Sequence, residues 1–511
     1  MTSEANWTSP GDAEQGDPRR WRALGVVLIG TFLILLDSTI VNVAIPSIQQ
    51  DLSASRSSIE WVISGYSLAY GLLLIPSGRL GDRFGYKRMF LFALAGFTAT
   101  SALCAVASSP TQLVVWRILQ GAMAGFLNPQ ILAIIQVEFS WQERGKAFGA
   151  YGAISGIGVA LGPLAAGLLI DWNVADSQWR PIFMVNVPVG IIALLLAGLW
   201  LREAKGRAGS LDLVGTLLVS AGVLLLTYPL VEVPENGWEP RSFILLAASV
   251  PVLALFVGWE LRRQRQGRDA LIDVRLFRNR GFTAGVTIGL TYFAGFISLW
   301  FVLSIYLQTG TGRGALAAGL ILLPFAVGML IGATLSDLVA KRIGRWVVTA
   351  GSSVVIVGTA GAIGTIHGVG TDLAGWHLLP ALFVAGFGSG LVISPNTDIV
   401  LRYVPWQDAG AASGILNVGQ RVGTALGIAI VSVAFFGAVD TGPGPASPAE
   451  LDRAFTHAVQ IGALYALGLV ALTFLASLLL PADSPKEQAT DWENSTTSES
   501  KAEWSQPGQS A

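Results

Sequence analysis

The chain has 511 residues, of which 52% are hydrophobic and only 13% charged, and its net charge is −1. A soluble domain carries about 25% charged residues, so this composition excludes an ordinary soluble protein. The near-zero net charge gives no indication of nucleic-acid binding. Cys104 is the only cysteine and the three histidines lack ligand spacing, so we expect no disulfide within the chain and no metal site.

Apolar segments long enough to cross a bilayer, which takes about 20 residues per helix, recur along the whole chain. The first follows a basic stretch ending at Arg22 and resembles a signal peptide in that respect. However, the run 24–45 is too long for one and carries Asp37, so we expect it to stay as the first membrane helix. A soluble helical repeat is the alternative, but it would need polar helix faces, and few exist here.

The pattern therefore predicts an all-α polytopic membrane protein with fourteen transmembrane helices. The expected spans are 22–45, 59–77, 89–108, 111–134, 145–170, 181–201, 212–230, 242–261, 282–307, 315–337, 346–366, 377–400, 409–438 and 457–480.

The basic residues predict which side each loop faces. If the amino terminus is cytoplasmic, 25 of the 32 Lys and Arg residues fall inside and five outside. This positive-inside bias predicts a multi-pass protein of the inner (cytoplasmic) membrane with both termini in the cytoplasm. The basic loop 262–281 either lies along the anionic leaflet or only fixes the topology.

Three charges lie deep within the expected spans, where a charge costs a few kcal/mol and is a functional candidate. They are Asp37, Arg117 and Arg421. At 1.5 Å per residue, Asp37 and Arg117 lie within about 5 Å of the same depth. If their helices are neighbours, the two side chains can share a polar network.

Burial and a nearby Arg pull the proton affinity of such a carboxylate in opposite directions. A change in that balance between inward-facing and outward-facing states would couple proton uptake to conformation, and we assign this role to Asp37 and Arg117. The alternative is a static ion pair that fixes helix packing. Arg421 either binds an anionic group of the substrate or pairs with a helix carbonyl.

The short loop after the second span holds a dense cluster of charges and glycines. Its candidate residues are Gly78, Asp82, Arg83, Gly85 and Lys87. Glycines let helix ends and loop approach closely, so the cluster suits a cytoplasmic latch between helix ends. The alternative is a positive-inside loop with one stray carboxylate.

The fifth span is rich in small residues, which permit close helix contact. It contains Gly152, Gly156, Gly158, Gly162, Pro163 and Gly167. A helix bent at proline with glycine faces can serve as a rocking surface between two parts of a transporter. Ordinary helix packing is the alternative and is compatible with that role.

We find no enzyme signature: no nucleotide-binding loop with Lys, no metal cluster and no soluble domain to hydrolyse ATP. Transport energy would then come from a gradient and need no cofactor.

Several motifs resemble those of the major facilitator superfamily, in particular its 14-helix drug:proton antiporter branch. Residues 36–46, LDSTIVNVAIP, look like that branch's first-helix motif, and 78–87, GRLGDRFGYK, look like the superfamily's loop motif. Residues 158–167, GVALGPLAAG, resemble the antiporter motif of the fifth helix. Arg117, Gln120 and Gly121 match a fourth-helix motif implicated in proton coupling.

The resemblance implies two six-helix halves, with the substrate cavity between them. The halves would be 21–205 and 266–481, with two additional helices in 206–265 and disordered cytoplasmic tails at 1–20 and 482–511. Taken singly, each candidate cavity residue fits packing between helices better than contact with a substrate. The candidates are Asn42, Tyr66, Tyr70, Asn128, Gln136, Phe296, Trp300, Asn417, Gln420 and Arg421.

The sequence also departs from the family pattern. Tyr86 replaces a usual basic residue of the loop motif, and Gln420-Arg421 stands where relatives usually read Arg-Gln. The thirteenth span lacks the mid-membrane carboxylate that some exporters of divalent cationic drugs carry, which weakens the case for dicationic substrates.

The resemblance implies proton-coupled multidrug efflux: export of an amphipathic drug or antibiotic, and hence antibiotic resistance. The partners would be a small-molecule substrate, protons and the lipid bilayer, with the protein acting as a monomer. One alternative is an exporter of an endogenous lipid, siderophore or metabolite. Another is a membrane receptor or membrane enzyme that transports nothing, although the sequence offers no sensor domain for it.

Overall fold

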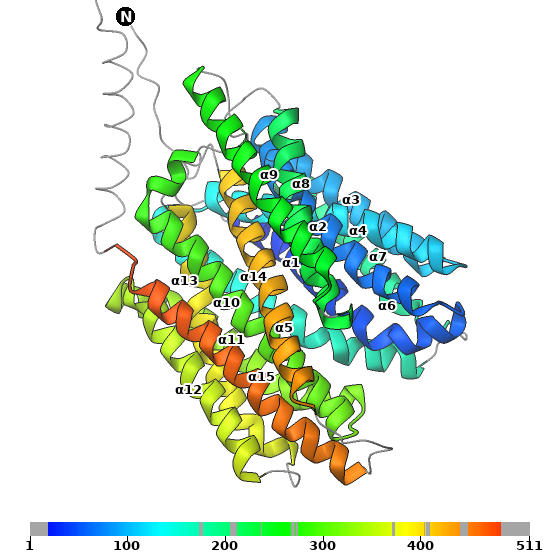
Figure 1. Ribbon diagram of the computed structural model, residues 1–511. Helices are drawn as coiled ribbons and strands as arrows, with labels where there is room; N and C mark the ends of the chain where they lie inside the picture. Colours follow the sequence, from blue (N-terminus) through cyan, green and yellow to red (C-terminus); the bar gives the residue numbers. More distant parts are fainter. Residues whose placement is uncertain are drawn as a thin grey trace, which may run out of the picture.

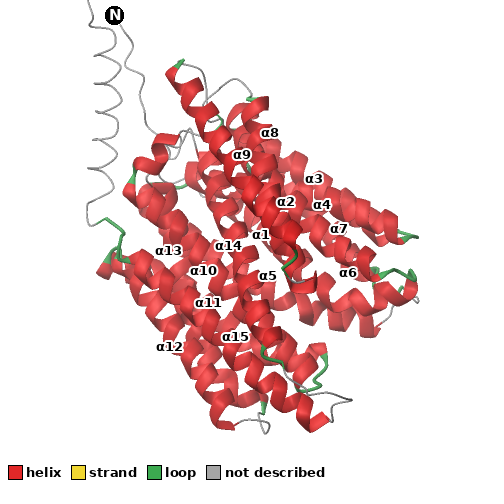
Figure 2. Ribbon diagram, in the orientation of Figure 1, coloured by secondary structure: helices red, strands yellow, loops and turns green. Residues whose placement is uncertain are grey.

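Helices make up nearly all of the described structure. The computed structural model describes residues 19–172, 177–204, 212–236, 238–266, 271, 274–369, 374–402, 404, 409–439 and 448–481, apart from the side chains of a few helical residues. Within these ranges there are helices and short connections but no strand (Figure 2). The predicted tail 482–511, and all of the tail 1–20 except its last two residues, lie outside the described residues.

The helices fall into three groups along the chain. The first group is α1 (Arg19–Asp51), α2 (Arg56–Phe84), α3 (Tyr86–Ala105), α4 (Pro110–Glu138), α5 (Trp141–Trp172), α6 (Pro181–Met184) and α7 (Asn186–Trp200). Then come α8 (Leu213–Asn236), α9 (Pro240–Arg265) and the short 3-10 segment η2 (Val274–Arg278). The last group is α10 (Arg280–Ile305), the π-helical turn η3 (Tyr306–Gly310), α11 (Ala315–Ile343), α12 (Trp346–Val369), the 3-10 segment η5 (Gly375–Leu378), α13 (Leu379–Arg402), α14 (Ala409–Gly437) and α15 (Pro448–Ser477).

These helices pack as two bundles that lie side by side (Figure 1). In the first bundle, α1 packs on α5 and α7, and α4 packs on α2 and α3. In the second bundle, α13 packs on α11 and α12, and α10 packs on α14 and α15. The bundles meet where α5 packs on α11 and where α2 packs on α14, and α8 contacts both α2 and α14.

The outward faces of the helices are apolar, as expected for a protein that sits in lipid. Leu199 on α7 is 76% exposed, Leu217 on α8 70% and Ile244 on α9 67%. Eleven helices of the described chain are long and apolar enough to cross a membrane by length and composition. Together these features describe a multi-pass membrane protein.

The predicted count of fourteen spans is not confirmed. A helix occupies each of the fourteen predicted segments, but α2, α5 and α8 fall outside the eleven. Glycine, serine and tyrosine dilute the apolar run of α2. In α5 the described side chains are interrupted at 159, 160 and 163, and the described apolar part of α8 is Val214–Leu230. The predicted span 181–201 is present as α6 and α7, which are separated at Val185.

Local sequence signals explain several of the helix boundaries. The Ser109 side chain accepts a hydrogen bond from the Gln112 backbone N–H, and Pro110 follows at the first helical position of α4. The side chain of Asn279 caps α10 in the same way. Between α2 and α3, Gly85 has a φ of 104°, a backbone conformation that favours glycine.

The two bundles are joined at the end of the molecule that carries Arg79, Arg83, Lys87 and Arg88, which we call the basic end. There the backbone N–H of Gly410 donates to Asp82 Oδ1 at 3.0 Å. A Cβ atom added to Gly78 would lie only 2.1 Å from the carbonyl oxygen of Gly410. The start of α14 therefore rests directly on the end of α2.

Gln136 of α4 adds a second link at the same end. Its side-chain amide donates to the backbone carbonyl of Leu401 at the end of α13 at 2.7 Å and to that of Val404, just beyond this helix, at 3.2 Å. Gln136 is completely buried. These buried hydrogen bonds stabilise the contact between the helix ends of the two bundles.

A stripe of glycines on α5 makes a further close contact between the bundles. A Cβ atom on Gly145 would lie 2.3 Å from Asp337 Oδ1, and one on Gly149 would lie 2.9 Å from the carbonyl oxygen of Ala333. Gly152 and Gly156 continue the stripe toward α13 and α11. Small residues at this spacing bring two helix backbones together.

We predict that Gly78→Val separates the bundles at the basic end, because the added side chain cannot fit against Gly410. A cysteine placed in the central cavity at Ser155 would then react with a membrane-impermeant maleimide added from the basic side, at least about tenfold faster than in the parent. Gly71→Val is the matched control, since a Cβ atom at Gly71 on the same helix has nothing within 4 Å. Equal labelling rates for the two variants would contradict the prediction.

Candidate functional site

Two of the deep charges predicted from the sequence meet inside the first bundle. Asp37 on α1 is completely buried and Arg117 on α4 is 2% exposed. The Nη1 atom of Arg117 lies 2.7 Å from Asp37 Oδ2, so the two form a buried ion pair. A charged hydrogen bond of this length is strong where water is excluded.

Other polar side chains complete the network around this pair. Gln120 and Asn186 donate to Asp37 Oδ1 at 2.9 and 3.0 Å. The Arg117 guanidinium also donates to Gln120 Oε1 at 2.7 Å and to the Val62 carbonyl at 3.2 Å. Both carboxylate oxygens are therefore bonded, which lets a charge persist at this depth.

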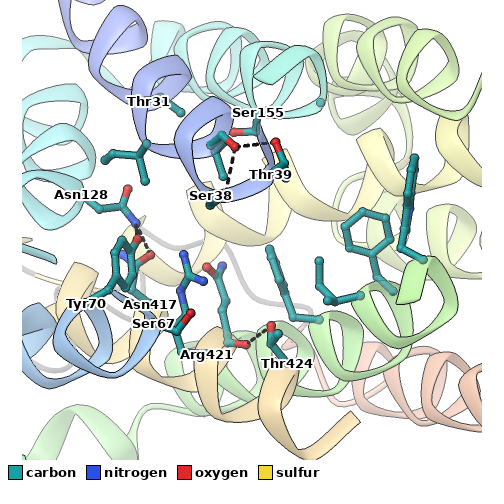
Figure 3. A pocket seen from close by; sticks show the side chains of 18 of the residues that line it. Thr31, Ser38, Thr39, Ser67, Tyr70, Asn128, Ser155, Asn417, Arg421 and Thr424 are labelled. Carbon is teal, nitrogen blue, oxygen red and sulfur yellow. Dashed lines mark hydrogen bonds between the residues drawn. The ribbon is translucent and has the colours of Figure 1, made fainter. Parts of the chain in front are cut away.

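One side of the network reaches a cavity. The guanidinium carbon of Arg117 lies 4.1 Å from the centre of the Tyr66 ring, and both residues line the cavity wall. The cavity has a volume of about 350 Å³ and lies between the two bundles. Figure 3 shows Ser38, Thr39 and Ser155 on one side of it and Tyr70, Asn417 and Arg421 on the other.

Amide and hydroxyl groups bridge the bundles beside this cavity. The Asn128 amide donates to Tyr70 Oη at 2.5 Å and to Asn417 Oδ1 at 2.6 Å (Figure 3). The Asn417 amide donates in turn to the Ser413 carbonyl at 2.8 Å. This chain connects α4 with α14 and holds Tyr70 in place.

Arg421 of α14 points into the cavity from the second bundle (Figure 3). Its guanidinium carbon lies 4.0 Å from the centre of the Tyr70 ring, a cation–π contact. The neighbouring Gln420 also lines the cavity. This place on the cavity wall is the one that the expected contact with a substrate requires.

Aromatic rings form the opposite wall. Phe296 of α10 and Phe325 of α11 stack with ring centres 5.3 Å apart and an interplanar angle of 18°. Trp300 packs edge-on against Phe325 with ring centres 5.1 Å apart. Phe296 also stacks on Tyr292 with ring centres 5.5 Å apart, so the wall presents an apolar aromatic surface to a ligand.

A smaller cavity of about 190 Å³ adjoins the central one under α8. Val223, Thr227 and Leu230 of α8 form its cover, and Arg421 lines both cavities. We call this space the side chamber. It makes the inserted helix α8 part of the lining.

Eight of the ten predicted cavity residues line the central cavity. They are Tyr66, Tyr70, Asn128, Phe296, Trp300, Asn417, Gln420 and Arg421. Gln136 does not line it and instead joins the bundles at the basic end. The side chain of Asn42 lies outside the described residues.

The sequence reasoning missed several residues of the site. Asn186 is one, although a polar residue inside the apolar run 181–201 was a usable signal. Tyr151, Ser155 and Phe325 also line the cavity. Nothing in their spacing distinguishes a residue that faces a cavity from one that faces a neighbouring helix.

The residues of the loop motif divide between two contacts. Gly78 and Asp82 contact the start of α14 in the second bundle, as described above. Lys87 instead donates to the Gly198 carbonyl of its own bundle at 2.8 Å, and Arg83 lies over the ring of Phe84.

Tyr86, which departs from the family pattern, has a clear structural role. Its hydroxyl donates to Asp82 Oδ1 at 2.7 Å, the same oxygen that accepts from Gly410. The tyrosine hydroxyl therefore stabilises the Asp82 carboxylate by a hydrogen bond, whereas a basic residue would stabilise it by its charge.

The antiporter motif of α5 lies on a different face from the glycine stripe that meets the second bundle. A Cβ atom on Gly158 would lie 3.0 Å from the Cβ of Leu35, and one on Gly162 would lie 1.9 Å from Thr39 Oγ1. Both glycines therefore pack against α1. Gly167 is partly buried, and the side chain of Pro163 lies outside the described residues.

Metal binding finds no support in the described part of the chain, where no three His, Cys, Asp or Glu side chains are grouped closely enough to hold an ion.

A profile of the Major Facilitator Superfamily matches residues 27–428. The chain belongs to this family. It is 38% identical over 447 residues to a probable actinorhodin transporter of Streptomyces coelicolor, with 87% of this chain and 77% of that protein covered. It is 36% identical to the puromycin resistance protein pur8 of Streptomyces alboniger, with 93% and 94% covered. With the tetracenomycin C resistance and export protein of Streptomyces glaucescens it shares 32% identity, covering 89% and 84%.

The fold is also similar to solved members of the family. The proton:xylose symporter XylE superposes with a TM-score of 0.62 over 90% of this chain and 96% of that one, at 14% identity. At this identity the likeness shows the fold alone. The family assignment makes the chain a transporter and not an enzyme, and its relatives are antibiotic exporters and resistance proteins.

We predict that Asp37→Asn lowers the free energy of unfolding by about 3–5 kcal/mol, because it leaves the buried charge of Arg117 without a counter-ion. The double variant Asp37→Asn/Arg117→Gln removes both charges and should lose less than the sum of the two single variants. Unfolding midpoints in detergent measure all three. Strictly additive losses would mean that the ion pair contributes no coupling.

Proposed function

We propose that this member of the Major Facilitator Superfamily is a proton-coupled antiporter that exports amphipathic drugs or antibiotics across the cytoplasmic membrane. The main support is the buried ion pair of Asp37 and Arg117, whose arginine lines a cavity between two bundles. The names of three relatives, which concern transport, resistance or export of antibiotics, point to the same class of substrate.

The topology proposed with this function is the one predicted from the charges. Fourteen spans would place both termini and the basic end in the cytoplasm. Residues 21–205 and 266–481 would act as two moving halves, and 206–265 would add two helices. The protein would work as a monomer with no cofactor and take its energy from the proton gradient.

In this topology the contacts at the basic end close the cytoplasmic entrance. Gly78, Asp82 and Gln136 on the first bundle hold the ends of α13 and α14. A rocker-switch motion that breaks these contacts would expose the cavity to the cytoplasm. The loop motif then serves as the latch that keeps the cavity open only to the outside.

Coupling would act through the ion pair. A proton added to Asp37 removes its negative charge and so weakens the bond to Arg117. Because Arg117 also contacts Tyr66 on the cavity wall, a shift of the guanidinium changes the surface that the substrate meets. Protonation from the outside would thus favour substrate release and return to the inward-facing state.

Asp37→Asn tests this role in inside-out vesicles that carry an imposed proton gradient. The substrate probe is whichever of puromycin, actinorhodin and tetracenomycin C the parent protein moves fastest. We expect the variant to lose substrate-induced proton release by at least about tenfold. Asp37→Glu, which keeps the carboxylate, should retain part of it.

Asp51→Asn is the matched control. Asp51 lies on the same helix as Asp37 but pairs with Arg180 at the end of the first bundle that is opposite the basic end. It should leave proton release unchanged. Normal coupled transport by Asp37→Asn would rule out Asp37 as the coupling acid.

An exporter of an endogenous lipid, siderophore or metabolite is the second candidate, favoured by relatives whose names include a cephamycin export protein as well as resistance proteins. Expression in a pump-deficient host separates the two. Drug export predicts lower accumulation of added antibiotics, whereas metabolite export predicts no resistance and a change in compounds secreted by the native cell.

A further inference from the structure

The charges that line the central cavity do not cancel. Arg117 is neutralised by Asp37 at 2.7 Å. Arg421 also lines the cavity, and no Asp or Glu is found among the described residues of its lining. The cavity therefore carries one positive charge in excess.

The Arg421 guanidinium is held in position without being neutralised. The face of the Tyr70 ring supports it at 4.0 Å, and Tyr70 is fixed through its hydroxyl by Asn128. A cation–π contact occupies the flat face of a guanidinium and leaves its N–H edge directed elsewhere. Among the described residues, we find no ion pair or hydrogen bond to the guanidinium of Arg421, so its donors are available to a ligand.

A cation placed between apolar walls inside a membrane protein is costly unless an anion meets it. Five N–H donors in a planar fork suit a carboxylate or another flat oxyanion, which can accept two parallel bonds. The excess charge thus selects for a ligand with an acidic group and against one with an ammonium group.

The remaining walls define the rest of the ligand. Phe296, Phe325 and Trp300 present stacked and edge-on rings on the second bundle. The side chamber beneath α8 is also lined by Arg421. A ligand anchored at Arg421 can therefore place flat rings against the aromatic wall and a substituent beneath α8.

We propose that the central cavity binds flat aromatic organic anions, with the acidic group of the ligand bonded to Arg421 and its rings packed on the Phe296–Phe325 wall. This inference rests on the proposed function, since it names the substrate class of that exporter. It is tested by binding alone, without any gradient or transport.

Three probes with the same ring system isolate the effect of charge: anthraquinone-2-carboxylate, anthraquinone-2-carboxamide and 2-(aminomethyl)anthraquinone as its ammonium salt. Equilibrium dialysis against the full chain in detergent gives a dissociation constant for each. We expect the carboxylate to bind at least about tenfold more tightly than the carboxamide, and the ammonium probe most weakly.

Two substitutions at Arg421 then test the anchor. Arg421→Gln should remove the preference for the carboxylate, whereas Arg421→Lys should keep part of it because the charge remains. Arg241→Gln is the matched control, since Arg241 is an exposed residue paired with Glu232 away from the cavity. It should leave all three constants unchanged.

Phe296→Ala tests the aromatic wall separately. It should weaken all three probes by a similar factor and leave the order of affinities unchanged, because the rings act on the shared anthraquinone. Tightest binding of the ammonium probe, or an unchanged carboxylate preference in Arg421→Gln, would overturn the inference.

The outcomes also separate this inference from the proposed function. Selective binding of the anion by a chain that transports nothing would leave the inference standing and remove the proposed function. Proton-coupled export by a chain whose Arg421→Gln variant still prefers the carboxylate would do the reverse.

Discussion

The buried ion pair of Asp37 and Arg117 is the interaction on which the first bundle depends. Two charges removed from water need nearly every donor and acceptor satisfied. Here Gln120, Asn186 and the Val62 carbonyl bond to the pair, and Gln120 also donates to Ser101 of α3 at 2.7 Å, so the network spans five helices. Helices that share one polar network cannot shift independently. The first bundle is therefore held as a unit, and a change in the charge of the pair acts on all five helices together.

The same constraint explains what the sequence predicted well. A deep charge stands out in an apolar run, so Asp37, Arg117 and Arg421 were recognisable without a structure, and depth alone suggested that the first two meet. The helix positions followed from apolar length for the same reason. Every predicted segment contains a helix, but among the described residues only eleven helices have the length and composition of a membrane span.

Which way a side chain faces could not be predicted. Gln136 and Asn128 are both amides on α4, yet one joins the basic end and the other lines the cavity. The glycines of α5 divide between α1 and the second bundle according to the face of the helix on which they lie. The rotation of a helix about its axis and the depth of a residue along it decide which neighbour the side chain meets. Both depend on packing between helices far apart in the sequence.

The inserted helix α8 has a mechanical consequence for the motion of the bundles. The Ser220 hydroxyl donates to the Leu72 carbonyl of α2 at 3.4 Å, whereas Leu230 and Val233 rest on Ala425 and Ala429 of α14. A directional bond resists sliding, but an apolar contact on alanines offers little resistance to it. If the bundles rotate relative to each other, α8 would move with the first bundle and slide over the surface of α14 in the second. The volume of the side chamber would then change in each transport cycle.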